Sequence, residues 1–197
     1  MGFLIVLLVA GCNAKQVLNP QEYIAWMSSG NSEVNNKKEI GNYSVAIKYL
    51  PQDYLALKEF KAPYDNKNKT KFNEARKKYE GHYYFLLRIV DEKNQKSVLR
   101  SDIDGYGEYT DRLNYFAFEA QNDFKLIEGK DTLDCVLHHF ENNYDLSPIN
   151  DITVVFKQGK PNNDLTFLWY DRALGLGTIK FFIEESDLEN IPTLNLN

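Results

Sequence analysis

The chain has 197 residues, of which 43% are hydrophobic, 14% aromatic and 26% charged. This composition is typical of one ordinary folded domain and excludes a disordered chain, which would hold fewer apolar residues. The formal net charge is −5, and residues 101–197 carry 18 Asp and Glu against 7 Lys and Arg, a balance that would repel phosphate and excludes nucleic acid as a partner.

The first element is an uninterrupted apolar run from Phe3 to Ala10. As a helix it would span about 12 Å, whereas the hydrocarbon core of a bilayer is about 30 Å thick. The run is therefore too short to cross a membrane, and its length is typical of the hydrophobic region of a secretory signal peptide. Met1 and Gly2 hold no Lys or Arg, which departs from the usual basic start of such a peptide.

The apolar run ends in Val9-Ala10-Gly11-Cys12, an aliphatic residue, two small residues and a cysteine. These four residues resemble the lipobox of bacterial lipoproteins. The resemblance implies cleavage between Gly11 and Cys12 and several acyl chains on Cys12, which together anchor a protein durably. Asn13 stands where lipoproteins of the inner membrane carry Asp, so the resemblance implies the outer membrane. The alternative is a cytoplasmic protein in which the apolar run forms a buried strand.

These features divide the chain into three parts. We predict a signal peptide in residues 1–11, a lipidated tether in residues 12–18 and a single β-rich domain in residues 19–197. The membrane is thus an expected partner through the acyl chains on Cys12, and the expected location is the cell envelope.

Helices are predicted near the start of the domain. Asn19-Pro20-Gln21-Glu22 combines an N-cap residue, a proline at the first helical position and a glutamate three residues after the cap. This pattern predicts a helix that begins at Pro20 and ends near Gly30. Residues 31–39 are polar and are predicted to be irregular, and further helices are predicted over 51–60 and 70–80.

Most of the remaining chain shows period-two alternation or short apolar runs, which are typical of strands. Strands are predicted over 43–49, 83–90, 113–120, 124–128, 133–141, 152–157, 165–170 and 178–184. Gly, Pro, Asn and Asp separate these segments, as turns require. We therefore predict a mainly β, α+β fold: an antiparallel β-sandwich of about eight strands, with two or three short helices toward the N-terminus.

One acidic segment partly matches a calcium-binding loop. Asp102 and Asp104 fall at its first and third positions and Gly107 at its invariant glycine. Leu113 stands where the closing glutamate belongs. We therefore predict an acidic surface loop, with Asp102 and Asp104 as the candidate metal ligands, and expect neither a metal nor another cofactor.

Aromatic residues supply the candidate ligand site. Trp169 and Tyr170 lie beside a predicted turn, where flat rings could stack on the faces of sugars. Ordinary core packing is the alternative for both.

No catalytic motif is present in the sequence. We therefore expect a non-catalytic module of the cell envelope that binds or scaffolds a partner protein. A carbohydrate-binding lipoprotein is the first alternative, on the strength of the aromatic residues. An envelope hydrolase is the second, because some pair among the 28 acidic residues could lie at catalytic spacing.

Overall fold

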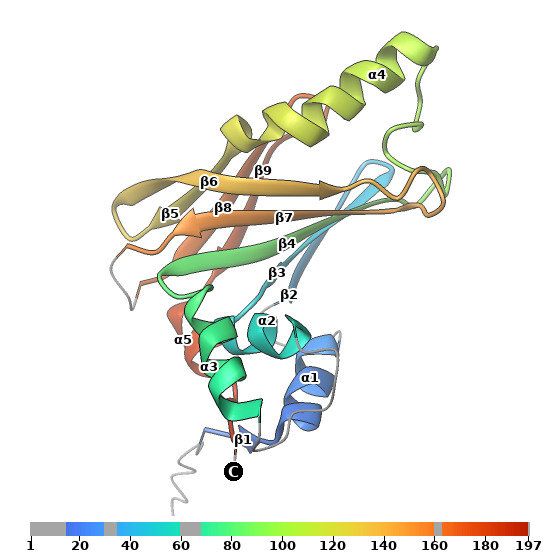
Figure 1. Cartoon of the computed structure of the whole chain (residues 1–197). Helices are drawn as coiled ribbons and strands as arrows, with labels where there is room; N and C mark the ends of the chain where they lie inside the picture. The colour runs from blue at the N-terminus through green and yellow to red at the C-terminus, as the bar shows by residue number, and fades with distance from the viewer. Residues whose placement is uncertain (1–14, 30–34, 60–67, 160–162, 197) are drawn as a thin grey trace, which may run out of the picture.

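A computed structural model describes residues 15–29, 35–59, 68–159 and 163–196 (Figure 1). The predicted signal peptide, its cleavage site between Gly11 and Cys12, and the predicted lipidation site, Cys12, lie outside the described residues. Across the described ranges, no helix has both the length and the apolar content that crossing a bilayer requires. Figure 1 shows a curved sheet with helices at two opposite ends.

Eight strands form one sheet in the order β2-β3-β4-β7-β6-β5-β8-β9. Every neighbouring pair is antiparallel. Along β4 and β9, buried and more exposed side chains alternate, as expected for strands with one covered face. The strands are β2 (Asn35–Ile40), β3 (Tyr43–Tyr49), β4 (His82–Asp91), β5 (Phe124–Glu128), β6 (Asp131–Glu141), β7 (Ile149–Lys157), β8 (Leu165–Asp171) and β9 (Gly177–Ile183).

The sheet curves until its two halves face each other. The ring centroids of Phe85 on β4 and Phe167 on β8 lie 5.4 Å apart, although three other strands separate β4 from β8 within the sheet. The ammonium group of Lys38 on edge strand β2 lies 5.7 Å from the ring centroid of Phe181 on the opposite edge strand, β9. The predicted mainly β, α+β domain of about eight antiparallel strands is confirmed, and its two packed layers are halves of one continuous sheet.

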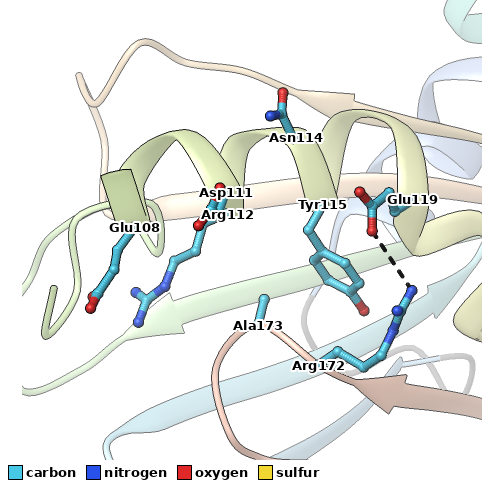
Figure 2. Close-up of a pocket in the computed structure, with 8 residues that line it drawn as sticks. All are labelled: Glu108, Asp111, Arg112, Asn114, Tyr115, Glu119, Arg172 and Ala173. Carbon is cyan, nitrogen blue, oxygen red and sulfur yellow. Dashed lines mark ion pairs between the residues drawn. The ribbon is translucent and has the colours of Figure 1, made fainter. Parts of the chain in front are cut away.

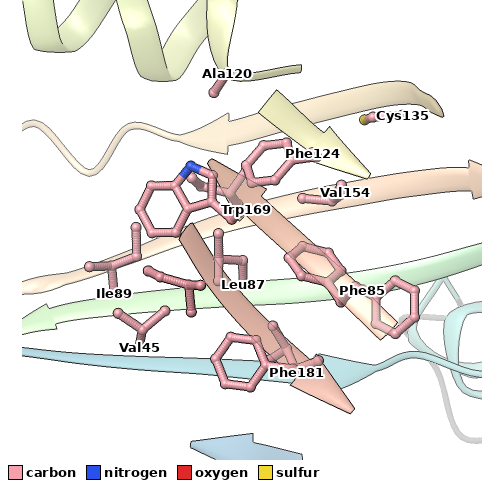
Figure 3. Packing of buried hydrophobic residues seen from close by; sticks show 14 of the residues in the cluster. Val45, Phe85, Leu87, Ile89, Ala120, Phe124, Cys135, Val154, Trp169 and Phe181 are labelled. Atoms are coloured by element: carbon pink, nitrogen blue, oxygen red, sulfur yellow. The ribbon is translucent and has the colours of Figure 1, made fainter. Parts of the chain in front are cut away.

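The main core lies between these two halves and is rich in aromatic rings. Figure 3 shows Leu87 and Ile89 of β4 and Trp169 of β8 pointing into the same space, and all three are fully buried. Phe85 makes edge-to-face contacts with Phe167 and with Phe156, the geometry that aromatic pairs prefer. The curved sheet is therefore a firmly packed base for the elements at its ends.

One end of the sheet carries the helices of the N-terminal half. These are α1 (Pro20–Ser28), α2 (Gln52–Glu59) and α3 (Lys69–Lys77), beside a two-stranded parallel sheet of β1 (Val17–Leu18) and β10 (Thr193–Leu194). The short helix α5 (Glu185–Glu189) precedes β10. Tyr23, Met27, Leu57 and Phe72 form the centre of a second apolar cluster there. The three predicted helices are thus present.

The predicted start of α1 is confirmed in detail. The side-chain oxygen of Asn19 accepts hydrogen bonds from the amides of Gln21 and Glu22, both at 3.0 Å. In return, the Glu22 carboxylate accepts the amide hydrogen of Asn19. Three of the amide groups that a helix leaves unpaired at its start are satisfied in this way.

Two segments differ from the predictions. Residues 35–39, predicted to be irregular, belong to β2. Residues 113–120, predicted to be a strand, are helical: α4 (Tyr106–Asn114) runs into a π-helical turn, η2 (Tyr115–Glu119), and a 3₁₀ turn, η3 (Ala120–Asp123). The prediction was wrong because a short apolar run fits a strand and a buried helix equally well.

Candidate functional site

The structure separates the two aromatic residues that the sequence singled out. Trp169 is 0% exposed, and its indole Nε1 donates a hydrogen bond to the Tyr115 hydroxyl at 3.1 Å. Its ring therefore offers no face to a ligand, and the assignment of Trp169 as a ligand-binding residue is corrected to a core residue. Tyr170 is 42% exposed on the other face of β8, because neighbouring side chains of a strand point to opposite faces.

The acidic segment does not adopt the geometry of a calcium loop. Asp102 has a left-handed backbone, with φ 48°, and accepts a hydrogen bond from Asn94. The Asp104 amide donates to the Glu108 carboxylate, and α4 has already begun at Tyr106. Among the described residues, no group of three His, Cys, Asp or Glu side chains is placed to hold a metal ion.

A cleft lies beneath α4, at the end of the sheet away from α1–α3. It measures about 440 Å³ and separates α4 and η2 from the loop that follows β8 (Figure 2). All but one of its lining residues carry a polar or charged group: Glu108, Asp111, Arg112, Asn114, Tyr115, Glu119, Arg172 and Ala173. A volume of this size matches the pockets that hold small molecules.

Arg112 fixes α4 to the loop between β4 and α4. Its Nη1 donates hydrogen bonds to the carbonyl oxygens of Val98, at 2.9 Å, and Ser101. Ser101 is itself held from inside the protein, because its hydroxyl donates to Asp91 and accepts from the Tyr43 hydroxyl at 2.9 Å. The position of the guanidinium group is therefore set by a buried hydrogen-bond network.

Asp91 is the centre of this network and is fully buried. Burial alone would raise the pKa of its carboxyl group, but hydrogen bonds from Ser101, Asn94 and the Lys93 amide outweigh burial and hold the pKa below its ordinary value. The carboxylate is thus stabilised in its charged form.

The floor of the cleft is the loop after β8. The Asp171 carboxylate accepts hydrogen bonds from the amides of Ala173, at 2.9 Å, and Leu176, at 2.7 Å. A third bond comes from the Leu174 amide. One side chain therefore holds several successive backbone groups of the loop and restricts its conformation.

The positive charge of Arg172 in this cleft is neutralised by neighbouring carboxylates. Its Nε lies 2.6 Å from the Asp123 carboxylate, and its Nη2 lies 4.0 Å from Glu119, the ion pair drawn in Figure 2. The guanidinium carbon lies 5.5 Å from the ring centroid of Tyr115.

Tyr115 links the cleft to the core. Burial raises the pKa of its hydroxyl well above the ordinary value, so the phenol remains protonated at neutral pH. The cleft thus combines fixed donors and acceptors, which is the chemistry of a binding site.

A second pocket of about 460 Å³ lies on the other side of Arg112. It is lined by the β2–β3 turn, Asp102, Arg112 and the loop after β8: Ile40, Gly41, Asn42, Tyr43, Asp102, Arg112, Leu174, Gly175 and Leu176. Arg112 lines both pockets, so this side chain lies where the two pockets meet.

Large apolar side chains are exposed next to this end of the molecule. Tyr106 at the start of α4 is 82% exposed, and Tyr144 and Leu146 in the β6–β7 loop are 79% and 89% exposed. Between them, Arg100 pairs with Asp145 at 2.6 Å. We call these five residues the α4 tip surface.

Ring contacts hold the α4 tip surface together. The Arg100 guanidinium lies 4.7 Å from the ring centroid of Tyr109, and that ring stacks with Tyr106 at 6.0 Å. Tyr144 and Asp145 both adopt left-handed backbone angles, with φ of 53° and 63°. Among the described residues, Asp145 Oδ1 is buried without a hydrogen-bond partner. Strained backbone angles and unpaired buried atoms cost folding free energy, and such features are concentrated at functional sites.

The sequence did not identify the cleft. Arg112 and Arg172 are sixty positions apart in the sequence. They line the same cleft only because α4 lies over the loop after β8. A helical signal was present, however, since Tyr109, Leu113, Phe116 and Ala120 are spaced as one face of a helix and pack against the main core.

Comparisons with known proteins identify no family for this chain. No protein-family profile and no curated protein matches it. Among solved structures, it is similar to a DUF4426 family protein from Pseudomonas aeruginosa PAO1, over 76% of this chain and 91% of the other. The TM-score is 0.36 and the sequence identity is 8%, and a likeness of this size carries no argument about fold or function.

Proposed function

We propose that this chain is an exported lipoprotein of the bacterial outer membrane, anchored by acyl chains on Cys12, whose β-rich body binds a partner protein without catalysis. The anchor rests on Val9-Ala10-Gly11-Cys12. The binding role rests on one observation: the α4 tip surface exposes three large apolar side chains on a strained, ion-paired scaffold. Apolar side chains grouped in this way mark interaction sites.

The placement of the two ends supports this proposal. Cys12 precedes the first described residue, Lys15, by three positions, and three residues span at most about 11 Å. Lys15 lies next to β1, which is at the end that carries α1–α3, whereas α4 lies at the opposite end (Figure 1). An anchor on Cys12 would therefore tether the first end and present the α4 tip surface away from the membrane.

Charge indicates the kind of partner. Asp102, Asp104 and Glu108, which lie just before or within the first turn of α4, are all exposed. A partner with an apolar centre and a rim of Lys and Arg would complement both the apolar side chains and these carboxylates.

Capture from solubilised membranes tests the binding role. We expect the full-length chain to recover one partner at stoichiometric yield, and the double variant Tyr144→Ser/Leu146→Ser to recover at least about tenfold less, because losing a contact of about 2 kcal/mol reduces affinity by more than tenfold. Both side chains are exposed, so the free energy of unfolding should change by less than about 0.5 kcal/mol.

Phe182→Ser is the matched control, since Phe182 is a half-exposed apolar residue on β9. It should recover the partner as the unsubstituted chain does. Recovery of no stoichiometric partner, or equal recovery by the double variant, would contradict the binding role.

A second candidate function, carbohydrate binding, is favoured by Tyr106. Its ring is 82% exposed and lies near Arg100 and exposed carboxylates, which could hydrogen-bond to sugar hydroxyls. On a glycan array, this function predicts that the unsubstituted chain binds a glycan and that Tyr106→Ala does not. If the unsubstituted chain binds no glycan, carbohydrate binding is contradicted and protein binding remains the proposed function.

A further inference from the structure

Arg112 differs from every other arginine in the chain. Each of the other four has a guanidinium nitrogen within 2.7 Å of an aspartate oxygen: Arg76 with Asp53, Arg88 with Asp151, Arg100 with Asp145 and Arg172 with Asp123. Within the described part of the chain, no carboxylate forms an ion pair with Arg112. Its charge is therefore the one arginine charge there that is not directly neutralised.

Arg112 also has hydrogen-bonding capacity to spare. A guanidinium group has five N–H donors, and the two hydrogen bonds to Val98 and Ser101 both come from Nη1. Among the described residues, Nε and Nη2 of Arg112 make no hydrogen bond. A half-buried group normally finds partners for its donors, so the remaining N–H groups are available to a ligand.

The two pockets give these donors a place to act. Arg112 lines both the 440 Å³ cleft and the 460 Å³ pocket, and Figure 2 shows its side chain reaching down from α4 toward the level of the loop that carries Ala173. The main-chain contacts of Arg112 and the restricted loop after β8 hold the two walls in place before any ligand arrives. Such preorganisation favours binding because little order remains to be imposed.

We propose that Arg112 binds the carboxylate of a small organic ligand in this double pocket. The planar guanidinium fork matches a carboxylate in two parallel hydrogen bonds. The ligand would also carry hydroxyl or ammonium groups, because Glu108 and Asp111 line the same cleft and carboxylate oxygens can accept hydrogen bonds from such groups. This inference is independent of the membrane anchor and of the α4 tip surface.

The acidic lining favours a carboxylate over a phosphate group. Glu108, Asp111 and Glu119 surround the cleft, and Arg172 is already paired with Asp123. A phosphate with nearly two negative charges would meet stronger repulsion from these carboxylates than a carboxylate with one. A sugar acid and the C-terminus of a peptide both present a single carboxylate beside polar groups.

Calorimetric titration of the full-length chain in detergent tests the proposal with two matched pairs of probes. D-Glucuronate is compared with D-glucose, and L-alanyl-L-alanine with its C-terminal amide. We expect one of the two carboxylate probes to bind with a Kd of about 1 mM or below and its neutral counterpart to bind at least about tenfold more weakly. The pair that responds distinguishes a sugar acid from a peptide terminus.

Substitutions then assign the binding to Arg112. Arg112→Gln keeps an amide donor for the loop carbonyls but removes the charge, and it should weaken binding of the responding probe by at least about tenfold. Arg112→Lys keeps the charge without the planar fork and should give an intermediate Kd. Arg88→Gln, at an arginine paired with Asp151 and outside both pockets, should leave the Kd unchanged.

Three results would overturn the proposal. Neither carboxylate probe binds; a neutral counterpart binds as tightly as its carboxylate; or Arg112→Gln and Arg112→Lys both bind as the unsubstituted chain does. If Arg112→Gln fails to fold, the comparison of each probe with its neutral counterpart and the Arg112→Lys variant still decide the question.

Discussion

Replacing Trp169 with alanine is expected to lower the free energy of unfolding by about 4 kcal/mol, the largest effect of any substitution considered. The side chain is 0% exposed and packs against the rings of Phe116 and Phe124, with centroids 6.4 Å and 6.2 Å away. Its loss leaves a cavity and removes the indole donor from the buried Tyr115 hydroxyl. Urea unfolding followed by circular dichroism measures the change.

Tyr170→Ala is the matched control, because the two residues are neighbours on β8 but face opposite sides of the sheet. Tyr170 is 42% exposed, so its removal should cost less than about 1 kcal/mol. Equal losses for the two variants would show that Trp169 is not in the core. Glycan binding that disappears only in Trp169→Ala, with stability unchanged, would restore Trp169 as a ligand-binding residue.

The second large effect is expected at Asp91. Asp91→Asn should lower the free energy of unfolding at pH 7 by about 3 kcal/mol, because the new amide group would face amide donors of Lys93 and Asn94 that now bind a carboxylate. Asp102→Asn is the matched control in the following loop. Asp102 is exposed with φ 48°, and asparagine tolerates that conformation, so the change should stay below about 0.5 kcal/mol.

The effect of Asp91→Asn should depend on pH in a defined direction. The pKa of Asp91 is lowered in the folded protein, whereas an unfolded Asp titrates near about 3.9. The charged carboxylate therefore adds its full stability above that value and loses it as pH falls through the lower folded pKa. The difference in free energy of unfolding between the unsubstituted chain and Asp91→Asn should therefore shrink as pH falls below about 4. A difference that stays constant or grows with acid would contradict this role.

Most strands could be predicted because buried and more exposed side chains alternate along them, and the residue types alternate in the same way. Val45 and Ile47 on β3 are buried, whereas Ala46 and Lys48 are less buried. An alternation of large apolar residues with small or polar ones is visible in the sequence. β2 escaped prediction because an edge strand needs no such pattern. Lys37, Lys38 and Glu39 are all exposed, and β2 is held by its backbone pairing with β3.

The helices at the two ends of the sheet differ in how clearly the local sequence marks their starts. α1 begins with a complete local signal, since Asn19 and Glu22 cap each other. α4 begins at Tyr106, and its N-cap residue, Gly105, offers no side-chain hydrogen bond. The apolar residues of α4 continue into η2. Only the spacing of Tyr109, Leu113 and Phe116 distinguished a helix from a strand, and the aromatic content of the run favoured a strand.

The candidate site could not be predicted because it depends on contacts between distant segments. Among the described residues, Arg112 has no carboxylate in an ion pair with it, and a feature of this kind cannot be read from the order of residues along the chain. Trp169 illustrates the converse, because an aromatic residue beside a turn occurs both in cores and at ligand sites. Local sequence patterns predicted individual helices and strands. The cleft, in contrast, forms because α4 lies over the loop after β8 in the folded chain.

Metabolic labelling with a clickable fatty acid tests the proposed anchor most directly. The unsubstituted chain should be labelled and sediment with membranes, Cys12→Ser should be unlabelled and remain in solution, and Cys135→Ser should behave like the unsubstituted chain, because Cys135 is buried in the sheet. Mass spectrometry should find a mature protein that begins at an acylated Cys12. A purified protein that retains Met1 and carries an unmodified thiol at Cys12 would contradict the proposal.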